Sequence, residues 1–282
     1  MGMSTYQELT DRALEFINSG NWEDAYEMLK QKEAANDKDA IAVLASFYLL
    51  GIGVAKDGER AVELFNKAIE MGSADAAFEL GFVYYDNDAG IPLNRYKMVE
   101  LLEKGAQGGH EGCFAALSSI YLNGDGVPAD HQKAFQYAML AAKAGHSTGM
   151  LNAAVCYEDG IGTGADPYAA SHWYKEYLNY EPNEVFVMTR IAICLADPGE
   201  RFRNRPTGEM LNEAFYYASK AVEAGDVEAH FVIGWFYEKG EIVQQNYELA
   251  HKYIEIAADN GSEGAREYLK RFKKNIFGQY YV

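Results

Sequence analysis

The stretch SSIYLNGDGVPADHQKAFQYAMLAAKAGH, residues 118–146, combines the features that decide the fold. Its first part runs into the glycine-rich turn GDGV at 124–127, and glycine supplies the positive-φ conformations that end a helix. Asp130 then offers a side-chain oxygen that caps the start of a second helix. The stretch therefore predicts two short helices joined by a tight turn, with Gly145-His146 closing the second one.

The same arrangement recurs along the chain at a nearly constant interval, which indicates a repeat protein. Successive anchor residues are spaced by 36, 37, 36, 36, 44 and 36 residues, and the anchors are Asn36, Gly72, Gly109, Gly145, Glu181, Gly225 and Gly261. One helix pair has too little core to be stable alone, whereas stacked neighbours bury a continuous core. The sequence predicts an all-α, right-handed α/α superhelix, a solenoid of about seven helix-turn-helix repeats.

Fixed positions within the repeat predict how its helices pack. Twelve places after most anchors stands a tyrosine, as at Tyr48 and Tyr121, and eleven places before each anchor stands an alanine or Met98. The alanines let two helices approach closely while the tyrosine fills the space opposite. Fifteen places before five of the anchors comes a residue suited to an N-cap, namely Asp57, Asn94, Asp130, Asp166 and Asn246.

The composition narrows the class of partner. The 282 residues include 42 acidic and 25 basic side chains, a formal net charge of −17. Such a field repels phosphate backbones and anionic lipid and favours basic or neutral partners. No apolar run approaches the length of a membrane span, and the first residues lack the features of a signal peptide. Three cysteines in apolar surroundings suit reduced, buried thiols, so we expect a cytoplasmic protein.

Four segments together resemble Sel1-like repeats, which are related to tetratricopeptide repeats. They are residues 118–146, FELGFVYYDNDAG at 78–90, ASHWYKEY at 170–177 and IGWFYEKGE at 233–241. The resemblance covers roughly residues 36 to 272, and residues 6–35 resemble an ordinary tetratricopeptide repeat. It implies a solenoid whose first helices line the concave face, and an adaptor function that is common in bacteria. We expect an N-terminal tetratricopeptide-like repeat at 1–35, Sel1-like repeats at 36–261 and a C-terminal cap and tail at 262–282, all in one continuous solenoid.

The fifth repeat, residues 181–224, departs from this pattern. It lacks the anchor glycine and the tyrosine, carries Arg190 where other repeats mostly have a small residue, and is eight residues longer within DPGERFRNRPTGEM. One Sel1-like subgroup staples each repeat with two cysteines seven residues apart. No such pair exists here, so neither disulfide stapling nor any activity proposed for that subgroup carries over.

The side chains that the first helices turn towards the concave side are the candidate partner contacts. Aligning the repeats places them three, six, ten, thirteen and fourteen residues after each anchor. Aromatic anchors surrounded by carboxylates suit a groove for a basic, partly apolar peptide or helix. An equally weighted alternative is that curvature buries some of them against neighbouring repeats. The candidates are Phe78, Phe82, Tyr85, Asp86, Glu158, Ile191, Glu228, Phe231, Trp235 and Glu238.

Two further segments stand out. The loop ERFRNRPTG at 200–208 carries Arg201, Arg203 and Arg205. The favoured interpretation is a loop exposed to solvent. The alternative is that the arginines bind an acidic segment or a phosphate. The C-terminal segment predicts a basic capping helix followed by the apolar tail FGQYYV at 277–282. That tail either folds back on the last repeat or docks on another molecule.

No motif predicts catalysis, a metal or a cofactor. The sequence has no HExxH, CxxC or GxSxG motif and no Walker-type loop, and its histidines fall one per repeat or at helix starts. Cys194 is the least ordinary of the cysteines because it lies in the aberrant repeat. We therefore expect a non-enzymatic scaffold for protein partners. A regulatory subunit in bacterial signalling or stress response, gating a partner enzyme, is the alternative, and a hydrolase comes third.

Overall fold

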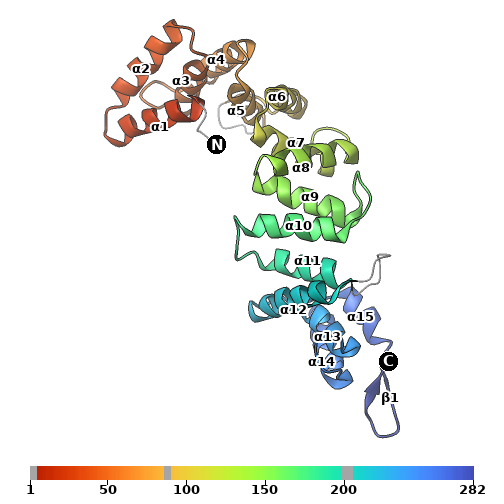
Figure 1. Cartoon of the computed structure of the whole chain (residues 1–282). Coiled ribbons are helices and arrows are strands. Elements are labelled where there is room, and N and C mark those ends of the chain that lie inside the picture. Colours follow the sequence, from red (N-terminus) through yellow and green to blue (C-terminus); the bar gives the residue numbers. More distant parts are fainter. Residues whose placement is uncertain (1–4, 86–89, 198–205) are drawn as a thin grey trace. The chain divides into compact units, whose positions relative to one another are not determined.

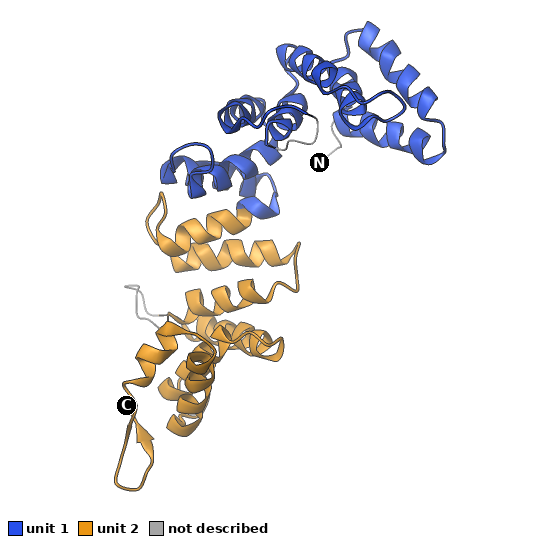
Figure 2. Ribbon diagram, turned by 180° about the vertical axis from the view of Figure 1, so that it is seen from behind, with its two compact units in different colours: residues 1–149 blue, residues 150–282 orange. Residues whose placement is uncertain are grey.

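The computed structural model describes residues 5–85, 90–197 and 206–282, and helices dominate these residues (Figure 1). The chain divides into two compact units, residues 1–149 and 150–282 (Figure 2). Their boundary falls inside helix α9 (Ser147–Asp159). The sequence predicts one continuous array, and this division coincides with neither of the segment boundaries expected from it.

In the first unit, consecutive helices pack as pairs, α3 on α4, α5 on α6 and α7 on α8, and α1 also contacts α3. The first helix of one repeat therefore lies beside the first helix of the next, as in a solenoid. The helices are α1 (Thr5–Asn18), α2 (Trp22–Ala34), α3 (Lys38–Leu50), α4 (Gly58–Glu70), α5 (Ala74–Val83), α6 (Arg95–Gln107), α7 (Glu111–Asn123) and α8 (His131–Lys143).

In the second unit, α11 pairs with α12 and α13 with α14, and α11 also contacts α13. The helices are α10 (Pro167–Leu178), α11 (Val185–Ala196), α12 (Gly208–Glu223), α13 (Glu228–Lys239), α14 (Tyr247–Asp259) and α15 (Glu263–Leu269), and two short strands follow, β1 (Lys273–Lys274) and β2 (Tyr280–Tyr281). The predicted all-α solenoid of helix-turn-helix repeats is confirmed. Among the described residues, none of the helices combines the length and apolar character needed to cross a membrane.

The predicted caps and turns are confirmed. In α4, α6, α8, α10 and α14 the expected Asp or Asn side chain accepts a hydrogen bond from a backbone N–H of the first turn. Gly51, Gly124 and Gly240 end α3, α7 and α13 in the left-handed conformation, with φ of 75°, 73° and 69°. In the fifth repeat a non-glycine residue, Asp197, takes this place after α11 with φ of 46°.

The core follows the repeat register. The alanines eleven places before the anchors, from Ala25 to Ala250, are all buried, and so is Met98. Tyr121 is buried as well, while the equivalent Tyr48 and Tyr237 pack partly buried against the same cores. Small residues on the second helices thus allow the close packing that the sequence predicts.

The C-terminal end forms a shorter cap than a helix that runs up to the tail at 277–282. The helix α15 has only seven residues, and β1 and β2 then form a hairpin that pairs Lys273 with Tyr281 and Lys274 with Tyr280. The ring of Tyr280 stacks on His251 of α14 with centroids 3.9 Å apart, and its N–H donates to Glu248. Of the two alternatives for the tail, the structure shows that it folds back on the last repeat.

Candidate functional site

Three aromatic side chains of α5 and the turn after it form a row on the surface of the first unit. Ring centroids are 4.9 Å apart for Phe78 and Phe82 and 6.3 Å apart for Phe82 and Tyr85. The exposed fraction is 39% for Phe82 and 45% for Tyr85, and Phe78 is half-buried. We call these three residues the α5 aromatic row. Phe82 and Tyr85 therefore expose apolar surface to solvent.

One end of the row packs against the start of α7. His110 stacks on Phe78 with centroids 4.4 Å apart, and its Nδ1 accepts a hydrogen bond of 3.2 Å from the Cys113 N–H. Gly112 lies directly against Phe78, because a Cβ at this position would be 2.8 Å from the ring. The next repeat therefore meets Phe78 with a residue that has no side chain, and it leaves Phe82 and Tyr85 exposed.

The other end of the row meets a cation. The Arg95 guanidinium lies 4.8 Å from the centroid of the Tyr85 ring and donates to both carboxylate oxygens of Asp125, at 2.7 and 2.6 Å. This pair joins the first residue of α6 to the turn that follows α7. Because Asp125 balances Arg95, the guanidinium holds the Tyr85 ring without adding net positive charge to the surface.

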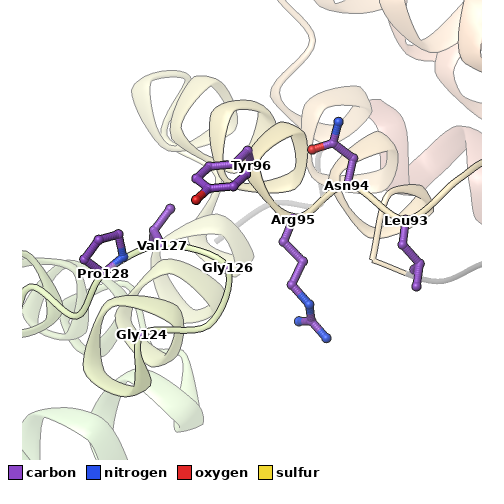
Figure 3. Close-up of a pocket in the computed structure, with 8 residues that line it drawn as sticks. All are labelled: Leu93, Asn94, Arg95, Tyr96, Gly124, Gly126, Val127 and Pro128. Carbon is purple, nitrogen blue, oxygen red and sulfur yellow. The ribbon is translucent and has the colours of Figure 1, made fainter.

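A surface pocket of about 640 Å³ lies where these segments meet (Figure 3). The Tyr96 ring extends towards Val127 and Pro128, while the Arg95 side chain points away from them (Figure 3). Tyr96 is 73% exposed, so this region adds apolar area near the row. The pocket is lined by Leu93, Asn94, Arg95, Tyr96, Gly124, Gly126, Val127 and Pro128.

Carboxylates gather beside the aromatic row. Burial, and next the charge of Asp75, raise the pKa of Glu79. Burial also raises the pKa of Asp39 on α3; Lys38 opposes this rise, and Asp75 and Asp37 add to it. These carboxylates of neighbouring first helices are close enough to repel one another. A cationic group that docks here relieves that repulsion.

The equivalent positions on α13 are mostly buried. Trp235 and Glu238 are 6% and 5% exposed, and Phe231 packs edge-on against Tyr268 of α15 at 5.1 Å between centroids. Glu228 is half-buried in the first turn of the helix. Trp235 and Glu238 present almost no surface to a partner, because the last repeat packs on this face. The alternative that neighbouring repeats bury groove residues therefore describes α13.

Glu158, predicted as a groove contact, is instead the acceptor of a buried network. The exposed fraction of Glu158 is 3%. The Tyr174 hydroxyl donates a hydrogen bond to Glu158 Oε2 at 2.9 Å. Arg190 donates from Nε to Oε2 at 3.0 Å and from Nη2 to Oε1. Burial alone lowers the pKa of Arg190, but Glu158 outweighs burial and the pKa is raised. Ile191 and Cys194 are fully buried. This network explains the unusual arginine of the fifth repeat.

Four predicted site residues lie outside the described part of the chain. They are Asp86, fourteen residues after the anchor Gly72, and the loop residues Arg201, Arg203 and Arg205. Their roles stay predictions.

The thiols and histidines do not form a reactive cluster in the described residues. All three cysteines are buried, and burial raises the pKa of Cys113 to about 12 and that of Cys156 to about 11. Thiols with such pKa values are protonated at neutral pH and are poor nucleophiles. His110 begins α7, as predicted, and burial lowers its pKa although Asp75 opposes this. Within residues 5–85, 90–197 and 206–282, His, Cys, Asp and Glu side chains nowhere form a group that could hold a metal ion.

Short helix pairs that end in glycine turns and stack in series define an α-helical repeat protein related to the tetratricopeptide class. The model of the Sel1 repeat family matches residues 38–73, 74–110, 115–146, 147–176, 211–226 and 227–262, more than half of the chain. The chain belongs to the Sel1 repeat family. The matched segments leave out all of α11, the helix that carries Arg190.

Known proteins agree with this assignment. The chitin synthase regulator SKT5 of Saccharomyces cerevisiae is 42% identical over 59 residues, which span 21% of this chain and 8% of that protein. The crystal structure of a protective antigen of uropathogenic Escherichia coli strains with an SLR fold matches with a TM-score of 0.69 at 22% identity, covering 94% of this chain and 56% of that one. A Sel1 repeat protein from Oxalobacter formigenes matches with a TM-score of 0.58 at 24% identity, covering 88% and 96%. The structural similarities support the fold.

Proposed function

We propose that this protein is a non-enzymatic scaffold that binds a basic, partly apolar peptide or helix of a partner protein through the α5 aromatic row. The observation that carries the proposal is the exposure of Phe82 and Tyr85 in a packed row. Membership of the Sel1 repeat family supports it, since members of this family generally act as adaptors.

The aromatic rings supply the binding energy in this proposal. A buried aromatic side chain covers about 150–250 Å² in total, and aromatic anchors in a protein interface often contribute about 2 kcal/mol or more. The row is already packed in the free protein, because His110 and Arg95 hold its two ends. Little conformational entropy is lost when a partner covers rings that are already fixed.

The carboxylates select the partner's charge. Asp75 and Glu79 lie on the helix that carries the row, and the protein as a whole has a formal net charge of −17. Complementary charge speeds encounter with a basic segment and disfavours an acidic one. Binding is therefore expected to weaken as the salt concentration rises.

Gating of a partner enzyme is the second candidate. One observation favours it: the 59-residue similarity to a protein named as a regulator of chitin synthase. A regulatory subunit would also work by binding, so the α5 aromatic row serves both proposals. They differ in whether the partner's turnover changes when the complex forms.

The test compares a variant of the row with the wild type. Partners are captured on the purified protein and identified by mass spectrometry, and the affinity of each purified partner is then measured by calorimetry. Phe82→Ala/Tyr85→Ala is expected to weaken binding by about thirtyfold, which corresponds to about 2 kcal/mol. Retention of every partner by the row variant would contradict the proposal.

A matched control removes two exposed aromatics from the other unit. Tyr180→Ala/Tyr216→Ala, at side chains that are 55% and 52% exposed, should bind as the wild type does. Trp235→Ala is no substitute for the row variant, because Trp235 is buried and its loss disturbs folding.

A further inference from the structure

The turn between β1 and β2 exposes two large apolar side chains at its tip. Ile276 and Phe277 are 93% and 80% exposed, the highest fractions among the large apolar side chains of the described residues. They occupy the two central positions of a turn that is closed by a hydrogen bond of 3.0 Å from the Gly278 N–H to the Asn275 carbonyl oxygen. These positions of a hairpin turn usually carry Asn, Asp or Gly. Two adjacent apolar side chains at such a tip indicate a contact surface.

The tip is held in place by its own hydrogen bonds and by the last repeat. The Asn275 side chain accepts hydrogen bonds from the N–H groups of Phe277 and Gln279, at 2.9 and 3.0 Å. Behind the turn, the Tyr280 ring stacks on His251 of α14. Figure 1 shows the loop that joins the two strands extending away from the helices of the second unit. Because the turn is already ordered, its tip loses little conformational entropy when it binds.

The hairpin and the residues just before it are basic in an otherwise acidic protein. Residues 268–282 contain four basic side chains and no acidic one, whereas the whole chain has a formal net charge of −17. Lys270 and Arg271 pair with carboxylates of the second unit. Lys273 and Lys274 of β1 are exposed, and neither forms an ion pair within the described residues. The hairpin therefore presents an apolar tip together with positive charge that is not balanced.

The α5 aromatic row has the complementary chemistry. Its exposed rings stand on a helix with two carboxylates, since Asp75 lies one turn before Phe78 and Glu79 one turn before Phe82. Glu79 forms no ion pair among the residues that the structure describes. A basic, partly apolar segment is the ligand proposed above for this row, and the hairpin of this same chain has that character.

Two other partners of the hairpin are less well matched. A second hairpin carries the same positive charge, so two tips that meet repel each other. An anionic membrane attracts lysines and admits apolar side chains, but the net charge of −17 opposes the approach of the protein to such a surface. An acidic, aromatic protein surface matches both the charge and the apolar tip.

We propose that the hairpin of one copy of this chain docks on the α5 aromatic row of a second copy. The tip, Ile276 and Phe277, covers the exposed rings of the row, and the two lysines of β1 approach the carboxylates of α5. Donor and receptor are different surfaces, so the interface is heterologous, and further copies add to the assembly unless it closes into a ring. The proposal rests on the proposed function, because it takes the α5 aromatic row as the receptor and names its partner.

Sedimentation velocity of the full-length protein tests whether copies associate. The average mass of the wild type is expected to rise with protein concentration and to fall as salt is added. Ile276→Ser/Phe277→Ser should weaken association by about thirtyfold or more, and serine is a common turn residue, so the hairpin is retained. Circular dichroism checks the fold of this tip variant. The control Tyr180→Ala/Tyr216→Ala, at exposed side chains away from the hairpin, should associate as the wild type does.

A mixing experiment identifies the receptor. The tip variant keeps an intact row, and the row variant Phe82→Ala/Tyr85→Ala keeps an intact tip. Each is expected to be monomeric alone, whereas an equimolar mixture should form a complex of one copy of each variant. A contact between two tips predicts a different result, because the row variant alone would then still associate.

The lysines are tested in the same way. Lys273→Gln/Lys274→Gln should weaken association by about tenfold and reduce its dependence on salt. The matched control Lys143→Gln/Lys252→Gln removes two exposed lysines from α8 and α14 and should change association little.

Three results would overturn the proposal. They are a wild type that stays monomeric at every concentration, a row variant that associates alone, and a mixture of the two variants that stays monomeric. Vesicles of phosphatidylserine and phosphatidylcholine separate the membrane alternative: a monomeric wild type that sediments with them only when its tip is intact assigns the tip to a lipid surface. A monomeric wild type whose other captured partners are lost in Phe82→Ala/Tyr85→Ala overturns this inference alone and leaves the proposed function standing.

Discussion

The same repeat positions have opposite environments on α5 and α13. Six, ten and thirteen residues after the anchor stand Phe78 and Phe82 on α5 with Tyr85 in the turn after it, and Phe231, Trp235 and Glu238 on α13. On α5 the second and third of these are 39% and 45% exposed, whereas on α13 they are 6% and 5% exposed. Phe82 and Trp235 occupy the same position of a helix, so the helical register alone does not decide which of them is exposed.

The residues of the following repeat differ between the two helices and account for the difference in exposure. On α5, the next first helix meets Phe78 with Gly112, which has no side chain to extend over the row. On α13, the next helix meets Phe231 with Tyr268, whose ring packs edge-on against it. Seven residues after the anchor, the repeat that follows α5 has Ala116 where the repeat that follows α13 has Tyr268, so a larger side chain at this facing position accompanies the burial of the α13 residues.

Among the variants that test this comparison, the largest loss of stability is expected for a change at Trp235. Trp235→Ala removes a buried indole from the core of the second unit and leaves a cavity, which typically costs about 3–5 kcal/mol. Urea unfolding followed by circular dichroism measures the loss. A change of less than about 1 kcal/mol, the size expected at the surface, would mean that Trp235 is not a core residue.

A slightly smaller loss is expected at the buried ion pair. Arg190→Met removes the guanidinium that contacts both oxygens of the buried Glu158, and the loss of one partner of a buried pair costs about 3 kcal/mol or more. The double variant Glu158→Leu/Arg190→Met removes both charges and should recover much of this loss, because an apolar pair of similar volume is often tolerated. A double variant less stable than Arg190→Met would show that the pair itself stabilises the fold.

The fold was predictable from the sequence because its determinants are local. The caps at Asp57, Asn94, Asp130, Asp166 and Asn246 and the turn glycines act within one helix turn, and each recurs in register. The constant repeat interval then predicts which helices pack against one another.

The site was less predictable because burial depends on residues a whole repeat away. Glu158 and Arg190 are 32 residues apart, and nothing local to either indicates that they pair. Arg95 and Asp125 are 30 residues apart, and no sequence pattern connects them with Tyr85. The strands of the C-terminal hairpin have two residues each, too few for a recognisable alternating pattern.

The free energy of unfolding is expected to depend on pH through Glu79, which lies on the helix that carries the α5 aromatic row. Its pKa is raised in the folded state, by burial and then by Asp75, so the unfolded chain releases this proton at a lower pH than the folded chain does. Ionised Glu79 therefore lowers stability above its ordinary pKa, by about 1.4 kcal/mol for each pH unit that separates the folded pKa from the unfolded one. Glu79→Gln should raise the free energy of unfolding at pH 7 and change it little at pH 3, as measured by urea unfolding at both pH values.

The control for this prediction is Glu70→Gln, an exposed carboxylate at the end of α4. It should change stability little at either pH. If Glu79→Gln also weakens binding of a basic partner, the carboxylate is retained for recognition at a cost in stability. Equal effects of Glu79→Gln at pH 3 and pH 7 would show that its ionisation does not matter.

The smallest effect on stability is expected at Phe82, the counterpart of Trp235. Phe82→Ala removes a ring that contacts Phe78 and Tyr85 but is 39% exposed, so the free energy of unfolding should change by about 0.5 kcal/mol, as at most surface positions. Urea unfolding of Phe82→Ala and Trp235→Ala under identical conditions measures the contrast directly. A loss at Phe82 as large as that at Trp235 would place the α5 aromatic row in the core of the first unit. The row could then not contact a partner, and the difference between the two helices would no longer be one of function.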